Sequence, residues 1–154
     1  MEPVEATDLP VVRPMEAGDV ERVVAIEIAS FSSAWRPETF LGLLNRPGAQ
    51  LWVLDDAEDG VIGYSVLWCI MDQGELANIA VADGHRGRGL GAFLLENMLD
   101  VGRAQGVASA YLEVSASNEE ANGLYHRFGF VQIGVRKRYY DNPREDALVM
   151  LQRL

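Results

Sequence analysis

The sequence predicts an α/β (α+β) fold with a mixed, mostly antiparallel central sheet of about seven strands and four helices. Three observations indicate this class. Apolar segments separated by turn residues follow one another between residues 51 and 82, which is typical of strands that meander antiparallel. An amphipathic helix is then expected over residues 88–105, because Leu90, Leu94 and Met98 recur at helical spacing. A strand follows this helix, so one parallel strand–helix–strand step lies within the sheet.

Cap signals define the first two helices. Asp19 is a suitable N-cap for a helix over residues 20–29, and Pro37 fits the first turn of a second helix that ends before Pro47-Gly48. Apolar runs bounded by turn residues indicate the strands of this half. These strands cover residues 11–13, 51–54, 61–71 and 75–82, with turns at residues 55–60 and 72–74.

The C-terminal half alternates strands and helices. Gly106 is expected to end the long helix, and a strand follows over residues 109–114. Another helix is predicted from residue 118 or 119 to Phe128, with Gly129 at its C-terminal end. Two final strands complete the predicted sheet.

The composition indicates a soluble, cytoplasmic protein with one domain. In a chain of 154 residues, residues 10–154 are expected to form this domain behind a loose tail of residues 1–9. The acidic N-terminus lacks the apolar run of a signal peptide, and no segment is long enough to span a membrane. A net charge of −10 disfavours nucleic acids and membranes as partners and suits a basic peptide or a polyamine. We expect a monomer or a weak dimer.

A glycine-rich segment marks the start of the long helix. Helix starts leave backbone N–H groups unpaired and carry a partial positive charge, and glycines let a phosphate approach these amides closely. The segment therefore predicts a diphosphate site. Its residues are Arg86, Gly87, Arg88, Gly89, Leu90, Gly91 and Ala92.

Two kinds of diphosphate ligand fit this segment. From Gly87 to Ala92 it matches the G-x-G-x-x-A fingerprint of dinucleotide sites, with Glu113 about where the ribose-binding acid belongs. The context argues against this interpretation. That fingerprint follows its strand directly and opens a first strand–helix–strand unit, whereas here a turn over residues 82–85 intervenes and most of the sheet precedes it.

Several segments resemble, in order, those of the GCN5-related N-acetyltransferases (GNAT). Arg86-x-x-Gly89-x-Gly91 matches the R/Q-x-x-G-x-G/A loop that holds the acyl-CoA pyrophosphate in that family. The other segments are Phe31-x-x-x-Trp35-x-x-x-x-Phe40, residues 111–118, residues 122–130, and Arg138-Tyr139-Tyr140 followed by residues 145–150. Within the family, the chain is most similar to RimI-type ribosomal-protein alanine N-acetyltransferases over about residues 11–154. The resemblance implies the GNAT fold with a central βαβ acyl-CoA site, and acetyl-CoA as co-substrate.

The implied reaction is direct attack by an α-amine on the thioester in a ternary complex, with the N-terminal alanine of a small-subunit ribosomal protein as acceptor. Such a transfer needs a base for the ammonium and an acid for the departing thiolate. Glu113 is the candidate base, because an α-amine of pKa about 7.7–8 needs only one carboxylate, acting directly or through water. Tyr125 is the candidate acid, because a phenol of pKa about 10 stays protonated at neutral pH.

The resemblance also implies how the cofactor is bound. Backbone N–H groups of Ile79, Ala80 and Val81 are expected to bind the pantetheine arm and the thioester. Asn118 is expected to bind the cofactor, to cap its helix, or to do both.

Aromatic and acidic residues are candidates for acceptor recognition. Phe31 and Trp35, with Phe40, are expected to lie over the acceptor groove, and Tyr139 and Tyr140 to form its opposite wall. Core packing explains any one of these aromatics equally well. The acidic candidates for binding a basic peptide are Glu27, Asp141, Glu145 and Asp146.

Other interpretations stay open at this point. The same chemistry could act on a small amine, such as an antibiotic or a polyamine, or the chain could be a noncatalytic module that senses acyl-CoA. Cys69 lies in an apolar strand without a base partner and is expected to be a core residue. His85 and His126 do not have metal-ligand spacing, so no metal site is predicted.

Overall fold

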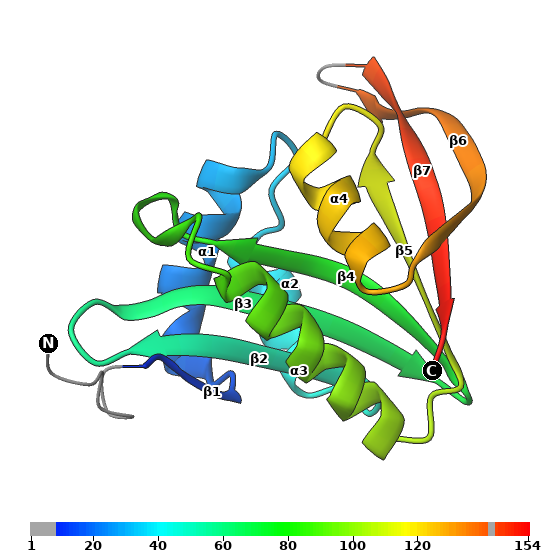
Figure 1. Ribbon diagram of the computed structural model, residues 1–154. Helices are drawn as coiled ribbons and strands as arrows, with labels where there is room; N and C mark the ends of the chain where they lie inside the picture. Colours follow the sequence, from blue (N-terminus) through cyan, green and yellow to red (C-terminus); the bar gives the residue numbers. More distant parts are fainter. Residues whose placement is uncertain (1–8, 142–143) are drawn as a thin grey trace, which may run out of the picture.

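The computed structural model describes residues 9–141 and 144–154, without the side chains of residues 138–141 and 144 (Figure 1). The strands are β1 (Val11–Pro14), β2 (Ala49–Asp56), β3 (Gly60–Ile70), β4 (Gln73–Val81), β5 (Ser109–Ser115), β6 (Val131–Asp141) and β7 (Arg144–Arg153). The α-helices are α1 (Val20–Ser30), α2 (Pro37–Leu44), α3 (Leu90–Ala104) and α4 (Glu119–Arg127). Short 3₁₀ turns, Ala17–Asp19 and Asp83–His85, precede α1 and α3.

The strands form one sheet in the order β1-β2-β3-β4-β5-β7-β6. Neighbouring strands pair antiparallel except β4 and β5, which are parallel and are connected through α3. Helices α1 and α2 pack on one face of the sheet, and α3 and α4 on the other (Figure 1). This arrangement confirms the predicted mixed, mostly antiparallel sheet with its central βαβ step.

The pairing of β4 with β5 is short. It runs from Gln73 opposite Ser109 to Leu76 opposite Leu112, and the two strands then diverge (Figure 1). At the same point β4 shifts its register against β3, beside Val66. The sheet therefore opens between the second half of β4 and the end of β5, and this opening positions the site described below.

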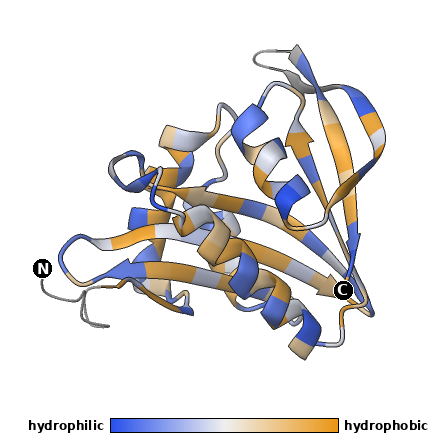
Figure 2. Cartoon of the chain, in the orientation of Figure 1, coloured by the Kyte–Doolittle hydropathy of each residue, from blue (hydrophilic) through white to orange (hydrophobic). Residues whose placement is uncertain are grey.

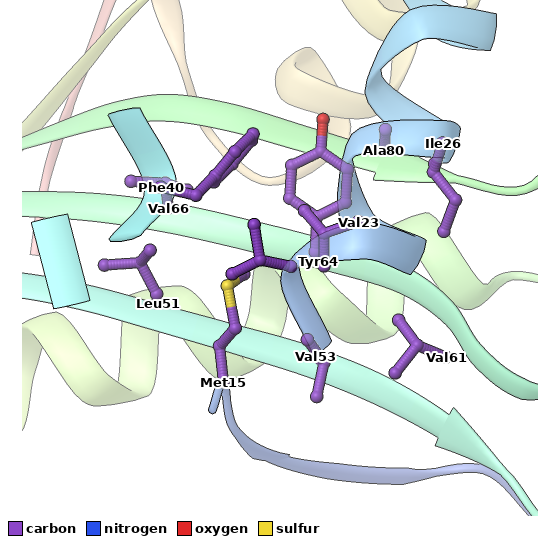
Figure 3. Packing of buried hydrophobic residues seen from close by; sticks show 11 residues of the cluster. Met15, Val23, Ile26, Phe40, Leu51, Val53, Val61, Tyr64, Val66 and Ala80 are labelled. Atoms are coloured by element: carbon purple, nitrogen blue, oxygen red, sulfur yellow. The ribbon is translucent and has the colours of Figure 1, made fainter. Parts of the chain in front are cut away.

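Apolar side chains fill the space on both faces of the sheet. The central strands are largely hydrophobic along their length, as Figure 2 shows, because helices cover both of their faces. Figure 3 shows the cluster on the α1/α2 face, in which Val23 of α1 and Phe40 of α2 pack against Tyr64 and Val66 of β3. None of the helices in the described part of the chain combines the length and the apolar character needed to cross a bilayer.

The turn between β3 and β4 lies earlier than the sequence predicts. The sequence predicts a turn over residues 72–74, but the turn comprises Met71 and Asp72, and Met71 has φ 55°. Gly74 lies inside β4, where an added Cβ would be 3.1 Å from Cγ1 of Val107. The glycine thus lets the segment after α3 pack closely on β4.

Asp19 precedes α1 as predicted, but its side chain does not cap the helix. Its carboxylate accepts bonds from the Glu16 N–H at 2.8 Å and from the two terminal nitrogens of Arg13 at 2.8 and 2.9 Å. The bond from Arg13 is the main reason that the pKa of Asp19 lies below its usual value. The residue joins β1 to the start of α1.

Replacing Gly48 with alanine is expected to lower the free energy of unfolding by about 2–4 kcal/mol. Gly48 has φ +87°, and an added Cβ would lie 2.5 Å from the carbonyl oxygen of Cys69, a backbone atom that cannot rotate away. Gly60→Ala is the matched control, because Gly60 has φ +72° and nothing within 4 Å of an added Cβ. Its cost is expected to be about 1 kcal/mol. Equal losses in urea unfolding would contradict the steric explanation.

Candidate active site

A cleft of about 480 Å³ lies between the end of β4, the start of α3 and helix α4. Most of the residues that the sequence predicted for cofactor binding line it, although these residues come from three separate parts of the chain. The predicted cofactor-binding residues that line the cleft are Ile79, Ala80, Val81, Arg86, Gly87, Gly89, Leu90, Gly91, Ala92, Asn118 and Tyr125. Phe31, which is predicted for acceptor binding, lines it as well.

The glycine-rich loop leaves its backbone accessible from the cleft. Gly87 and Gly89 have φ of 80° and 77°, a conformation that residues with a Cβ rarely adopt. A Cβ at either position would meet nothing within 4 Å, so space is open above the backbone. Gly89 is the N-cap of α3 and has no side chain to occupy the first amides of the helix. This geometry fits a diphosphate held by backbone N–H groups.

The Arg86 side chain is engaged within the protein. Its Nε donates to the Val81 carbonyl at 3.0 Å, its Nη2 donates to the Ser30 Oγ at 3.1 Å, and its Nη1 lies 2.6 Å from an Asp83 oxygen. The guanidinium therefore ties the glycine-rich loop to β4 and to the end of α1.

Among the predicted loop residues, all of them described, Arg88 alone is absent from the cleft lining. Its Nη1 lies 2.9 Å from Nδ1 of His85, whose Nε2 lies 3.0 Å from Asp59. The side chain thus turns toward the β2–β3 hairpin. A different cation, Arg127 in the last turn of α4, lines the cleft in its place.

Arg127 and several other cleft residues are not among those predicted from the sequence. A usable signal was present, because Glu120, Leu124 and Arg127 recur at i, i+4 and i+7 and so share one face of α4. No such pattern marks the cleft residues that come from elements other than α4. The further lining residues that were missed are Ser30, His85 and Ala121.

Strand alternation decides which amides of β4 face the opening. The Ala82 N–H donates to the Ile62 carbonyl of β3 at 2.8 Å. Because N–H groups alternate sides along a strand, the amide of Ala80 also points toward β3, whereas those of Ile79 and Val81 point toward the diverging β5. Two of the three predicted amides are thus placed to donate to a ligand.

Tyr125 is at once a core residue and a cleft residue. The side chain lines the cleft and only 6% of the residue is exposed. Its ring packs edge-on against Phe130, with 5.8 Å between the centroids. Nearby, Asn118 lines the cleft while its Oδ1 accepts the Ala121 N–H at 3.1 Å, so its capping role does not remove it from the site.

Glu113 does not line this cleft. It alternates on β5 with Leu112 and Val114, which pack together with Tyr125 under α3 and α4, so its carboxylate lies on the opposite face of the sheet. Its Oε1 lies 2.9 Å from Nε of Arg136 on β6, and its side chain is 14% exposed. The candidate acid and base therefore approach the opening between β4 and β5 from opposite faces.

A second carboxylate accompanies Glu113 on this face. The Tyr111 hydroxyl donates to Glu75 of β4 at 3.2 Å. Burial raises the pKa of the Tyr111 phenol, and the Glu75 and Glu113 carboxylates raise it further, whereas Arg136 opposes them. Among the described side chains on this face of β4 and β5, two carboxylates thus lie close to one guanidinium, that of Arg136.

The aromatic residues predicted for acceptor binding do not lie at one common site. Phe31 lines the cleft, but Trp35 packs against the buried Phe40 with 5.4 Å between ring centroids. Tyr139 and Tyr140 belong to β6, and their side chains lie outside the described residues.

The acidic acceptor candidates are mostly engaged elsewhere. Glu27 is buried under α1, so its prediction as a surface contact for a basic peptide is wrong. Glu145 accepts bonds from the Ser115 and Ser117 hydroxyls, which lower its pKa, and Asp146 lies 3.4 Å from the Lys137 ammonium. The side chain of Asp141 lies outside the described residues.

The class of protein follows from the groups that meet at this opening. A helix start able to bind a diphosphate, strand amides able to polarise a carbonyl and a phenol able to donate a proton line a single cleft. Transfer of an acyl group from a diphosphate-bearing thioester to an amine uses all three. In the described residues, no group of three or more His, Cys, Asp or Glu side chains is arranged to hold a metal ion.

Comparisons with known proteins agree with this class. The model of the acetyltransferase (GNAT) family matches residues 20–130. The ribosomal protein bS18-alanine N-acetyltransferase of Salmonella typhimurium is 34% identical over 134 residues, which cover 86% of this chain and 89% of that protein. The chain therefore belongs to the acetyltransferase (GNAT) family, and the dinucleotide interpretation of its glycine-rich loop is excluded.

Solved structures give the same result. The ribosomal-protein-S18-alanine N-acetyltransferase from Escherichia coli superposes with a TM-score of 0.86 at 29% identity, covering 94% of each chain. Ard1 from Thermoplasma volcanium superposes with a TM-score of 0.88 at 25% identity, covering 95% of this chain and 98% of that one.

Proposed function

We propose that the protein is an acetyl-CoA-dependent N-terminal (α-amino) protein acetyltransferase, and that its acceptor is the N-terminal alanine of a small-subunit ribosomal protein. The observation that supports this most is the similarity, over nearly the whole chain, to bacterial proteins named for this reaction. We further propose that residues 10–154 act as one domain, as a monomer or a weak dimer, and that the partner is a basic protein N-terminus.

The cleft suggests how the co-substrate is held. The diphosphate of acetyl-CoA would lie against the backbone amides from Gly87 to Ala92, with Arg127 as a nearby cation. The amides of Ile79 and Val81 would donate to the thioester carbonyl, where negative charge develops during attack. The thioester supplies the acetyl group, and this arrangement aligns it with the opening in the sheet.

Two side chains would move the protons. Glu113 takes a proton from the acceptor ammonium on the α1 face, and Tyr125 donates its phenolic proton to the departing sulfur on the other face. The attack is direct and needs no enzyme nucleophile. Cys69 is not such a nucleophile in this scheme, because burial raises the pKa of its thiol and it does not line the cleft.

The electrostatics of the acceptor face support a basic substrate. Two carboxylates, Glu75 and Glu113, lie on this face beside a single cation of the described residues, Arg136, and the chain as a whole has a net charge of −10. A peptide with arginine near its N-terminus would be attracted to this surface and oriented along it.

The test is thiol release from acetyl-CoA with an arginine-rich peptide that begins with alanine. We expect turnover with the free α-amine and none with the same peptide blocked at its N-terminus. A third peptide, with a free N-terminus and acidic residues in place of the arginines, is expected to have a higher KM. The position of the acetyl group is then read by mass spectrometry.

Other outcomes would contradict the proposal. Equal turnover of the free and blocked peptides would show acetylation of a side chain. Turnover of a polyamine or an aminoglycoside but of neither peptide would move the function to small amines. Binding of acetyl-CoA without transfer to any amine would indicate that the protein is a noncatalytic sensor of acyl-CoA.

A further inference from the structure

Glu27 is a buried carboxylate that the proposed mechanism does not use. It lies in α1 with 1% of the residue exposed. The side-chain amide of Asn78 donates to its two oxygens at 2.7 and 3.1 Å, and the backbone N–H of Trp35 donates to Oε2 at 3.0 Å. The hydroxyl of Tyr64 donates to Oε1.

All three partners of Glu27 are hydrogen-bond donors. Burial and the neighbouring carboxylate raise the pKa of the Tyr64 phenol, so this hydroxyl keeps its proton. An ionised carboxylate has acceptor sites for every one of these donors. A glutamine of the same shape would have one acceptor oxygen and would direct an NH₂ group at another donor. In this arrangement the surroundings thus favour a carboxylate over a glutamine.

The three donors belong to three different segments of the chain. Trp35 lies in the loop between α1 and α2, residues 31–36, which also places Phe31 at the cleft. Asn78 lies in the part of β4 that diverges from β5, directly before Ile79. Tyr64 lies in β3, and Figure 3 shows its hydroxyl extending along α1 toward the level of Ala80.

We propose that Glu27 is a positioning residue for the acceptor, an inference that rests on the proposed function. It fixes the α1–α2 loop against the diverging half of β4. The loop that carries Phe31 and the strand that carries the amides of Ile79 and Val81 are thereby held at a constant separation. Because Asn78 precedes Ile79, the same carboxylate also fixes the backbone beside the thioester.

The glycine-rich loop is tied to α1 by a separate contact, the bond from Arg86 to Ser30. Loss of the Glu27 contacts leaves this tie and the first turn of α3 in place. We therefore expect acceptor binding and transfer to depend on Glu27 more strongly than the binding of acetyl-CoA, because the diphosphate contacts at the glycine-rich loop are kept.

A reciprocal exchange of charge tests the proposal. We expect Glu27→Gln to raise the KM of the arginine-rich peptide about tenfold, while the Kd of acetyl-CoA changes by less than about twofold. Asn78→Asp places two carboxylates together and is expected to have a similar effect. The double variant restores a donor–acceptor pair between the two positions and should recover peptide KM to within about threefold of the parent.

A second measurement does not depend on activity. Amide hydrogen exchange in residues 31–36, including the Trp35 N–H, is expected to be faster in each single variant and slower again in the double variant. Leu99→Ala is the matched control. Leu99 is a buried residue of α3, on the face of the sheet opposite to Glu27. This variant is expected to lower stability without altering peptide KM. Where Glu27→Gln fails to fold, Tyr64→Phe removes one donor and should raise peptide KM by about threefold.

Two results would overturn the proposal. One is a lower stability of Glu27→Gln with unchanged peptide KM and unchanged exchange in residues 31–36. The other is a parallel rise of peptide KM and acetyl-CoA Kd, which would indicate general loosening. Failure of the wild-type protein to acetylate the peptide would refute the proposed function instead, and hydrogen exchange would still decide whether Glu27 holds the loop.

Discussion

Replacing Tyr125 with phenylalanine is expected to lower kcat about 10²- to 10³-fold, because the departing thiolate loses its proton donor. The Kd of acetyl-CoA should change by less than about threefold, since the ring still packs against Phe130 and still closes the cleft. The variant is therefore expected to bind both substrates and to fail at the transfer. Steady-state kinetics with a direct binding measurement separate these two effects.

Tyr111→Phe is the matched control for this prediction. This change also removes a phenol from a partly buried site, here in β5. The Tyr111 hydroxyl donates to Glu75 of β4 at 3.2 Å. We expect its kcat to stay within about threefold of the parent, because a single hydrogen bond at this site affects stability rather than proton transfer. A Tyr125→Phe variant with parental kcat would remove the phenol from the mechanism.

Replacing Glu113 with glutamine is expected to lower kcat/KM for the peptide about 10²- to 10³-fold near neutral pH. The amide keeps the shape of the side chain but cannot take the proton of the acceptor ammonium. An α-amine has a pKa of about 7.7–8, so above this pH the acceptor is deprotonated by solvent and the base is no longer needed. The ratio of parent to variant rates should therefore shrink as the pH rises from 7 to 9.

Arg136→Gln separates the base from its ion pair. Arg136 Nε lies 2.9 Å from Oε1 of Glu113, and the arginine side chain is 60% exposed. Because the arginine side of this pair is exposed, its loss is expected to cost only about 1 kcal/mol of stability, and kcat/KM should stay within about fivefold of the parent. A rate ratio for Glu113→Gln that does not vary with pH would indicate a structural role for the carboxylate.

In the proposed mechanism, the opening in the sheet matters because Glu113 and Tyr125 lie on opposite faces of that sheet. Glu113 alternates with Leu112 and Val114, and these two pack against the helix that carries Tyr125. Fully paired strands would separate an acceptor on one face from a leaving group on the other. The divergence of β4 from β5 after Leu76 removes this barrier, so one reaction can use both groups.

The sequence by itself determined the fold class, the glycine-rich loop and most residues of the cleft. These features depend on local signals. Strand and helix periodicity, the caps Asn118 and Gly129 and the spacing from Arg86 to Gly91 can all be read within about one turn or one strand. The structure confirms the sheet and its central βαβ step, and it brings Ile79, Gly89 and Tyr125 to one cleft.

Local signals also explain the errors near turns. A glycine is typical of a turn when only its neighbours in sequence are considered, and the predicted turn over residues 72–74 includes Gly74. Its real neighbour is Val107, which reaches it only after α3 has returned the chain to β4. The requirement for a glycine was correct, but its cause was packing.

Only the tertiary structure decided how the charged side chains are used. Glu27 and Asn78 are 51 residues apart in sequence, and Arg86 and Ser30 are 56 apart, so neither pair has a local signature. From the sequence alone, a carboxylate in an amphipathic helix is expected to be a surface charge. In the fold, two donors from the sheet and one from the α1–α2 loop surround Glu27 and allow its burial. The pairing of Glu113 with Arg136 likewise has no local signature, because it forms only after β6 has paired with β7. The position of each of these charges therefore depends on burial and on partners that are distant in sequence.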